Sequence, residues 1–177
     1  IRNAEALERM EKVDTLVIDK TGTLTEGRPT LTGIVTANGH AEDELLRLAA
    51  GVERASEHPL ALAIVAAATE RGMPIPDVKD FDSPIGRGAL GTVESHAVVL
   101  GSSHFLAAQH IDTTELDDRA STLRGDGATV IYIGTDGKLA GLFSIADPIK
   151  ATTPAALDAL RGAGIRIVML TLSLIHI

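Results

Sequence analysis

The chain has 177 residues, enough for one large domain or two small ones with a sizeable core. Hydrophobic residues make up 45% of it but aromatic residues only 2%, so the core must be aliphatic. The formal charge of −8 argues against nucleic acid or an anionic membrane as a general partner, and the absence of cysteine excludes disulfides and thiolate metal sites within these residues.

The two ends of the chain carry the pattern of a parallel sheet with helices. Residues 3–12 have the apolar spacing of a helix, and residues 15–18 read as a short buried strand with Asp19 at its carboxyl end. Near the other end, a helix over residues 153–161 precedes a continuous apolar strand over residues 165–170. No run has the length of a membrane span and no signal-peptide pattern is present, so we expect the chain to be soluble.

The middle of the chain is predicted to mix hairpins with helices. Strands are expected over residues 31–36, 88–93, 97–100, 129–134 and 138–145, and helices over residues 42–53, 59–71, 103–108 and 113–123. Asp136-Gly137 between the last two strands is the strongest hairpin signal, whereas the proline-rich residues 73–84 are expected to be irregular. The sequence therefore predicts an α/β fold with an inserted α+β domain.

The run Asp19-Lys20-Thr21-Gly22-Thr23-Leu24-Thr25 carries the most specific chemistry. A carboxylate at the carboxyl end of a parallel strand lies in the crevice where open α/β sheets bind ligands. There Asp19 can attack the terminal phosphoryl group of a nucleotide and form an aspartyl-phosphate. Lys20 and Thr21 would stabilise charge beside it, and Asp19 and Thr21 are the residues expected to ligate Mg²⁺.

This heptapeptide resembles the phosphorylation signature of the P-type ATPases, a branch of the haloacid-dehalogenase-like fold. Simple phosphatases of that fold carry a second Asp two positions after the nucleophile, where this chain has Thr21. A hydroxyl cannot take up a proton as a carboxylate does, so the phosphoenzyme should persist, which favours a pump. A soluble phosphatase and a nucleotide-binding module without chemistry remain the alternatives.

A second group of residues points to nucleotide binding. His58 can stack on or hydrogen-bond an adenine, Glu53 can accept from its exocyclic amine, and Gly86 and Gly88 would let a loop lie against the nucleotide. Each signal is weak alone, because a Ser-Glu-His-Pro string is usually a helix start with Ser56 as its cap. Their order after the Asp19 motif resembles the heavy-metal-transporting (type IB) P-type ATPases, in which the matching residues bind adenine.

Two features depart from that resemblance or add nothing to it. That branch often has Gly-Asn where this chain has Gly101-Ser102, which puts the corresponding nucleotide contact in doubt. The remaining histidines are interpreted as surface or loop residues without a metal-ligand spacing: His40, His96, His104, His110 and His176.

Asp147-Pro148-Ile149-Lys150 and the strand that leads to Thr171 resemble the return into the phosphorylation domain. In the family this strand ends in Thr-Gly-Asp, so Thr171 is expected to be catalytic, but residues 172–177 do not continue the pattern. A second phosphate-binding Asp, a magnesium-binding Asp and a phosphate-contacting Lys are therefore expected to be missing. We expect this chain alone to be inactive.

The resemblance implies a haloacid-dehalogenase-like, parallel-sheet phosphorylation domain over residues 1–28 and 145–171. It is incomplete, encloses a nucleotide-binding domain over residues 29–144, and is followed by an unrelated tail over residues 172–177. The implied function is part of an ATP-driven cation pump that uses ATP and Mg²⁺. Its partners would be the transmembrane and actuator domains of the same pump, at the cytosolic face of a membrane. The sequence of residues 143–150 most resembles that of copper exporters, but zinc, cadmium or cobalt remain alternatives for the transported metal.

Overall fold

The computed structural model describes residues 13–170, and these form two compact units. One unit contains residues 13–28 and 147–170, and the other contains residues 29–146. The predicted helix over residues 3–12, Thr171 and the tail over residues 172–177 lie outside the described residues. The expected functional division into a phosphorylation domain and a nucleotide-binding domain stays a prediction at this point.

The larger unit is built on a six-stranded antiparallel sheet. In spatial order its strands are β2 (Thr30–Thr36), β7 (Lys138–Ala146), β6 (Thr129–Thr135), β5 (His96–Gly101), β4 (Gly88–Val93) and β3 (Val78–Asp82). The β4–β5 and β6–β7 hairpins turn where the sequence predicts, and Asp136 takes the left-handed conformation in the second turn. That conformation is the one a tight two-residue hairpin requires.

Strand β3 is a correction, because residues 73–84 were expected to be irregular. It pairs with β4 at the edge of the sheet, and the register shifts between Lys79 and Asp82. Asp80 has φ +53° inside this shift, so the strand is irregular there. Because of this irregularity, its residues do not alternate between apolar and polar as those of a regular strand would. Pairing with β4, rather than an intrinsic preference for extended structure, explains the strand.

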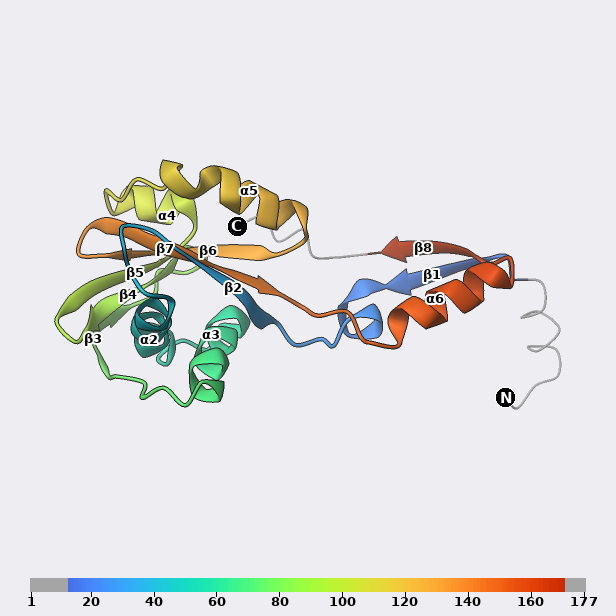
Figure 1. The fold of residues 1–177 in the computed structure, drawn as a ribbon, viewed down its shortest axis with the longest axis horizontal. Coiled ribbons are helices and arrows are strands. Elements are labelled where there is room, and N and C mark those ends of the chain that lie inside the picture. The colour runs from blue at the N-terminus through green and yellow to red at the C-terminus, as the bar shows by residue number, and fades with distance from the viewer. Residues whose placement is uncertain (1–12, 171–177) are drawn as a thin grey trace. The chain divides into compact units, whose positions relative to one another are not determined.

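Helices cover both faces of this sheet (Figure 1). Their bounds are α2 (Glu42–Glu53), α3 (Pro59–Glu70), α4 (Ser103–Ala108) and α5 (Asp117–Gly125), the last entered through a short 3₁₀ turn over Thr114–Leu116. Ile131 and Ile133 pack in the cluster that contains α2 and α3, whereas Val130 and Tyr132 pack in the cluster that contains α4 and α5. This alternation of successive residues is what a strand covered on both faces produces.

The smaller unit has a two-stranded parallel sheet of β1 (Thr15–Asp19) and β8 (Arg166–Leu170), with α6 (Thr153–Gly162) packed against β8. Its strands are less buried than predicted, since Val17 is 54% exposed and its register partner Val168 is 38% exposed. Only two strands of this sheet lie within the described residues, so much of their apolar surface is uncovered. The predicted combination of a parallel sheet with an inserted α+β unit is confirmed.

No helix within residues 13–170 has the length and hydropathy that crossing a membrane requires. This finding concerns only the part of the chain that the structure describes.

Candidate functional site

Asp19 is the last residue of β1, and its side chain is exposed at the carboxyl end of the strand. Its register partner is Leu170, the last residue of β8, so the ends of the two parallel strands lie side by side. Thr171 would follow Leu170 directly, but it lies outside the described residues. The strand-end position that the sequence predicts for Asp19 is present, while its chemical role stays a prediction.

A tight turn over Lys20–Leu24 follows Asp19. Gly22 adopts φ +75° and ψ −12°, a left-handed conformation that glycine reaches without the steric cost of a side chain. Thr21 and Thr23 on either side of it are exposed, and Lys20 is half-buried. The turn therefore presents two exposed hydroxyl groups within four residues of Asp19.

Thr25 is buried behind this turn and connects it to a distant part of the chain. The Gly22 N–H donates to Thr25 Oγ1 at 3.1 Å, and Thr25 Oγ1 donates to Asp147 Oδ2 at 2.5 Å. The other oxygen of Asp147 accepts from the Arg28 N–H at 3.1 Å. A single carboxylate thus stabilises both the turn after Asp19 and the segment that leaves it.

Residues 148–153 form further bonds to the same loop. Lys150 Nζ donates to the Gly22 carbonyl oxygen at 2.7 Å, and the Lys150 N–H donates to the Leu24 carbonyl oxygen at 3.0 Å. Thr153 Oγ1 also donates to the Leu24 carbonyl, at 2.8 Å. The sequence indicated that Asp147-Pro148-Ile149-Lys150 belongs to this domain, but it did not reveal that these residues bind the Asp19 loop.

Glu53 is the last residue of α2, and its side chain is buried although it carries a carboxyl group. Burial raises the pKa of Glu53 to about 7, with a side-chain hydrogen bond to Ser56 acting in the opposite direction. Its place at the carboxyl end of a helix adds to the cost of a negative charge there. Glu53 can therefore exchange a proton near neutral pH, which a surface glutamate cannot.

His58 itself caps α3, which corrects the expectation that Ser56 does so. His58 Nδ1 accepts from the Leu60 N–H at 3.2 Å, and Ser56 Oγ accepts from the His58 N–H at 3.3 Å. Because Nδ1 accepts, we infer that the neutral ring carries its proton on Nε2. The exposed ring is thus held at the helix start, and its Nε2–H has no hydrogen-bond partner among residues 13–170.

The two glycines of the predicted nucleotide loop have different structural roles. Gly86 lies in an exposed turn with φ +70°, and a Cβ built on it meets no atom within 4 Å. A Cβ on Gly88 would lie 2.1 Å from the Leu100 carbonyl oxygen and 2.6 Å from Phe105 Cδ1. Gly86 is therefore open for close approach of a ligand, whereas Gly88 is also required for packing of β4.

Ser102, which replaces the asparagine common in the resembling family, caps α4. Its Oγ accepts from the Phe105 N–H at 3.2 Å. The hydroxyl is thus already used as an acceptor by its own helix, but it keeps a proton that it can donate.

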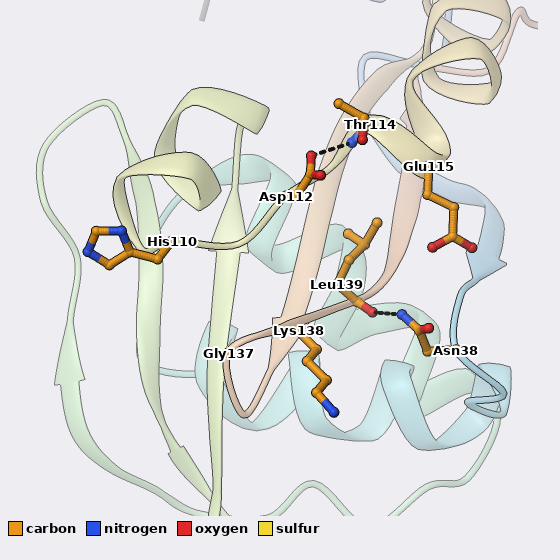
Figure 2. Close-up of a pocket in the computed structure, with 8 residues that line it drawn as sticks. All are labelled: Asn38, His110, Asp112, Thr114, Glu115, Gly137, Lys138 and Leu139. Atoms are coloured by element: carbon orange, nitrogen blue, oxygen red, sulfur yellow. Dashed lines mark hydrogen bonds between the residues drawn. The ribbon is translucent and has the colours of Figure 1, made fainter.

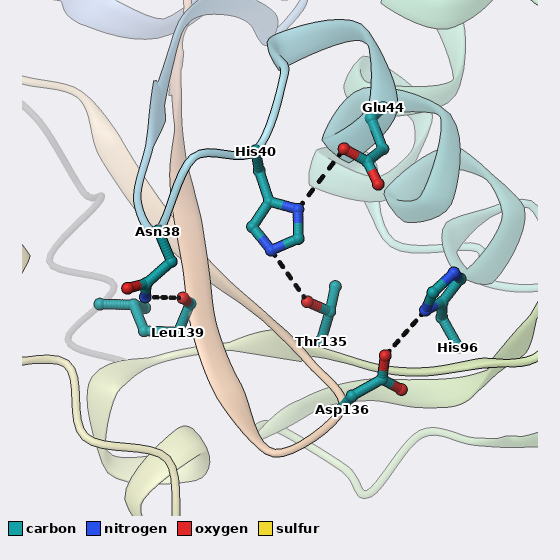
Figure 3. Close-up of polar contacts among 7 residues, drawn as sticks. All are labelled: Asn38, His40, Glu44, His96, Thr135, Asp136 and Leu139. Carbon is teal, nitrogen blue, oxygen red and sulfur yellow. Dashed lines mark hydrogen bonds and ion pairs between the residues drawn. The ribbon is translucent and has the colours of Figure 1, made fainter.

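Polar contacts of two histidines connect elements of the larger unit: His96 joins the β4–β5 hairpin to the β6–β7 hairpin, and His40, just before α2, contacts α2 and β6 (Figure 3). His96 Nδ1 lies 2.7 Å from Asp136 Oδ2, and His40 lies between Glu44 at 3.5 Å and Thr135 at 3.4 Å. The hydrogen bond with Asp136 raises the pKa of His96, and its charge raises it further. Within residues 13–170, no group of three His, Asp or Glu side chains is placed to hold a metal ion.

A polar hollow of about 340 Å³ lies elsewhere on the larger unit (Figure 2). It is lined by Asn38, His110, Asp112, Thr114, Glu115, Gly137, Lys138 and Leu139. None of these is among the residues predicted to bind the nucleotide. The hollow therefore gives no support to the predicted adenine site.

Comparison with known proteins places these features in a family. A family model described as haloacid dehalogenase-like hydrolase matches residues 13–176. The chain belongs to this family. The haloacid-dehalogenase-like assignment of the fold made from the Asp19 motif is thereby confirmed.

Among haloacid dehalogenase-like proteins, the chain resembles metal pumps over nearly its whole length. It is 57% identical over 171 residues to the silver exporting P-type ATPase of Salmonella typhimurium, covering 97% of this chain and 21% of that protein. It is 52% identical to a copper-transporting P-type ATPase of Rhizobium leguminosarum bv. viciae, with 97% and 20% covered. The chain thus spans about a fifth of the length of these relatives.

A solved structure agrees with these relatives. The crystal structure of a zinc-transporting PIB-type ATPase in its E2·Pi state matches with a TM-score of 0.84 and 32% sequence identity. The match covers 94% of this chain and 27% of that one. The predicted resemblance to heavy-metal-transporting P-type ATPases is confirmed.

Proposed function

We propose that this chain is the ATP-binding and phosphorylating part of a P-type ATPase that exports a heavy metal, with Asp19 as the phosphate acceptor. The observation that carries the proposal is an exposed carboxylate at the end of a parallel strand, followed by a turn bonded to residues far along the chain. The resemblance to silver- and copper-transporting ATPases over 97% of the chain supports it.

In the proposed reaction, an Asp19 carboxylate oxygen attacks the γ-phosphorus of ATP. The bond between that phosphorus and the oxygen bridging to the β-phosphate breaks, and ADP leaves with the electron pair. Lys20 and the Thr21 hydroxyl would balance charge on the transferred group. Thr21 stands where a simple phosphatase has its second carboxylate, so hydrolysis should be slow enough for a transport step.

The adenine is proposed to bind at the connection between α2 and α3. The Nε2–H of His58 has no partner among the residues that the structure describes and could donate to the base. The His58 ring offers a face for stacking, and Glu53 is a buried acceptor a few residues away. Gly86 would allow the loop before β4 to approach the base, since its backbone is unshielded. Gly88 would contribute through the shape of the same loop.

Mg²⁺ fits the chemistry of the Asp19 site in part. This ion takes oxygen ligands and usually binds one or two carboxylates together with water and substrate phosphates. Asp19 offers a carboxylate, and Thr21 offers a hydroxyl and a carbonyl oxygen two residues later. The bound ion would neutralise charge on the phosphates, while Asp19 supplies the attacking oxygen.

We propose a copper or silver ion as the transported metal, by likeness to the two relatives. The residues that select it would belong to the transmembrane domain of the same pump, and the transmembrane and actuator domains would be the partners of this chain. The proposed setting of this chain is then the cytosolic side of that membrane.

Phosphorylation is tested in membranes that contain the complete pump to which this chain would belong. With γ-labelled ATP and Mg²⁺, copper or silver should stimulate an acid-stable, hydroxylamine-sensitive label. Asp19→Asn should abolish the label because an amide oxygen is a poor nucleophile, whereas Asp14→Asn should retain it. Label that persists in the Asp19→Asn pump would exclude Asp19 as the acceptor, and rapid hydrolysis of small phosphate esters would favour a phosphatase.

Nucleotide binding is tested on the chain itself by calorimetric titration. We expect ATP to bind with a Kd between about 1 μM and 1 mM. His58→Ala should weaken binding by about 1–3 kcal/mol, since it removes a stacked or hydrogen-bonded partner. His104→Ala, which also removes an exposed histidine, should have no effect. Equal affinities for wild type and His58→Ala would remove His58 from the site.

A further inference from the structure

Gly22 is the most adaptable residue in the turn after Asp19. It has a left-handed backbone, its surface is exposed, and no atom of residues 13–170 lies within 4 Å of where its Cβ would stand. Glycine also has more backbone freedom than any other residue. Gly27 does lie against the backbone of Gly22, since a Cβ on Gly27 would stand 3.2 Å from Gly22 Cα. On its open side, however, Gly22 is restrained by hydrogen bonds and not by packing against the described residues.

Both peptide groups that flank Gly22 are held by such bonds. The Gly22 N–H, on one side, donates to the buried Thr25 hydroxyl at 3.1 Å. The Gly22 carbonyl, on the other side, accepts from Lys150 Nζ at 2.7 Å. Only the second bond comes from outside the loop, across 128 positions of sequence.

The backbone of Lys150 is held in place by hydrogen bonds around the Leu24 carbonyl. Its backbone N–H donates to the Leu24 carbonyl, and the Thr153 hydroxyl donates to that same oxygen. Its side chain is half-buried, and no carboxylate within the described residues lies within 4.0 Å of its ammonium group. The ammonium group is thus directed to one backbone oxygen rather than to an acidic partner, and a charged donor forms a strong bond there.

We propose that Lys150 is a positioning residue for Asp19: its ammonium group fixes the Gly22 turn, and with it Thr21 and the backbone that would surround the transferred phosphoryl group. The inference rests on the proposed phosphorylation of Asp19. It adds a residue that acts through the loop and touches no substrate. Small displacements of such groups lower phosphoryl-transfer rates strongly, because the reaction depends on positioning.

The first test measures the turn in the chain itself, by amide hydrogen exchange followed with NMR. In Lys150→Met, the Gly22 and Thr25 amides should exchange about tenfold faster or more, because one side of the turn is released. Lys150→Arg should restore protection, since its guanidinium can reach the same carbonyl. Lys138→Met, in the larger unit, is the matched control. Unchanged β1 amides show that the unit remains folded, and unchanged Gly22 exchange in Lys150→Met overturns the proposal.

The second test measures the consequence in the complete pump. At saturating ATP, the initial labelling rate of Lys150→Met should fall about tenfold or more, while the ATP concentration for half-maximal labelling changes less than about threefold. Lys150→Arg should recover most of the rate. If Asp19→Asn abolishes labelling but Lys150→Met labels at the wild-type rate, the positioning role is wrong and the proposed function stands. If Asp19→Asn still labels, the proposed function itself fails.

Discussion

The hydroxyl oxygen of Thr25 lies 2.5 Å from a carboxylate oxygen of Asp147, across 122 positions of sequence. Thr25 is 3% exposed, and the same oxygen accepts the Gly22 N–H. The bond to an ionised carboxylate is of the short, charge-assisted kind. It connects the loop that follows β1 to the segment that precedes α6, so the two separate stretches of the smaller unit are joined next to Asp19.

Replacing Thr25 by Val should destabilise the smaller unit by about 2–3 kcal/mol. Valine has the same shape but leaves the Gly22 N–H and one oxygen of Asp147 without their partner. The change should be followed by hydrogen exchange. Fluorescence would not report it, because all the aromatic side chains lie in the larger unit: Phe81, Phe105, Tyr132 and Phe143.

Thr25→Ser is the control for this experiment. It keeps the hydroxyl and loses only a methyl group, so its cost should be about 1 kcal/mol or less. Equal effects of the Ser and Val variants would show that the methyl group, and not the bond to Asp147, stabilises the loop.

Glu53→Gln should stabilise the larger unit at neutral and alkaline pH. The pKa of Glu53 is raised from 4.5 to about 7, so the folded chain holds a proton that the unfolded chain has lost in this window. Wild-type stability therefore falls as pH rises from 4.5 to about 7 and then levels off, whereas the glutamine variant lacks this loss. The difference should reach about 3 kcal/mol at most.

Urea unfolding at several pH values, followed by Tyr132 fluorescence, measures this difference. Glu57→Gln, which changes an exposed carboxylate close by, should show no comparable trend. A Glu53→Gln curve parallel to that of the wild type across the whole pH range would mean that folding does not raise the pKa of Glu53.

The ion pair of His96 with Asp136 should stabilise the two hairpins only in an acidic window. Protonated His96 contributes fully below the ordinary histidine pKa of 6.5, and the contribution is lost as pH rises through its raised folded pKa. The pKa of Asp136 is lowered by the same hydrogen bond, so its contribution is lost as pH falls below 3.8 through the lowered value.

His96→Gln should therefore lower the thermal midpoint at about pH 5.5 more than at about pH 8.5. Both groups are exposed, so the change should be small at either pH. His104→Gln removes a histidine from the exposed side of α4 and serves as the control. A larger effect at the alkaline pH would contradict the assignment.

Local pattern was enough to place much of this fold. The helix over Glu42–Glu53 and the hairpin at Asp136 follow from apolar spacing and turn residues within a few positions of each other. Strand β3 did not follow, because its pairing with β4 overrides a broken local pattern. Pattern also overstated the burial of Val17, which depends on how many strands surround it.

The features of the candidate site likewise fall into those that local sequence predicted and those that it did not. The strand-end position of Asp19 and the helix start at His58 could be read from neighbouring residues. The bonds from Asp147 and Lys150 to the Asp19 loop could not, because they join positions more than 100 residues apart. That His58, and not Ser56, caps α3 depends on side-chain geometry. The sequence did not reveal it, since both residue types can accept from a helix N–H.

The two glycines of the nucleotide loop should separate folding from binding. Gly88→Ala should destabilise the larger unit by about 3 kcal/mol or more, because its Cβ would overlap the Leu100 carbonyl and the Phe105 ring. Gly86→Ala should cost only about 1–2 kcal/mol, the strain of a left-handed alanine in open space. Thermal unfolding followed by Tyr132 fluorescence measures both values.

ATP titration of the same variants then tests the role of the loop. If the loop lies against the nucleotide, Gly86→Ala should lose about tenfold in affinity under conditions where it remains fully folded, because the added methyl group stands on the open side. Gly72→Ala is the matched control, since it also places alanine at a positive φ in open space, at the end of α3. Wild-type affinity in Gly86→Ala would place the nucleotide away from this loop. Equal losses in Gly86→Ala and Gly72→Ala would mean that backbone strain, and not contact with ATP, lowers the affinity.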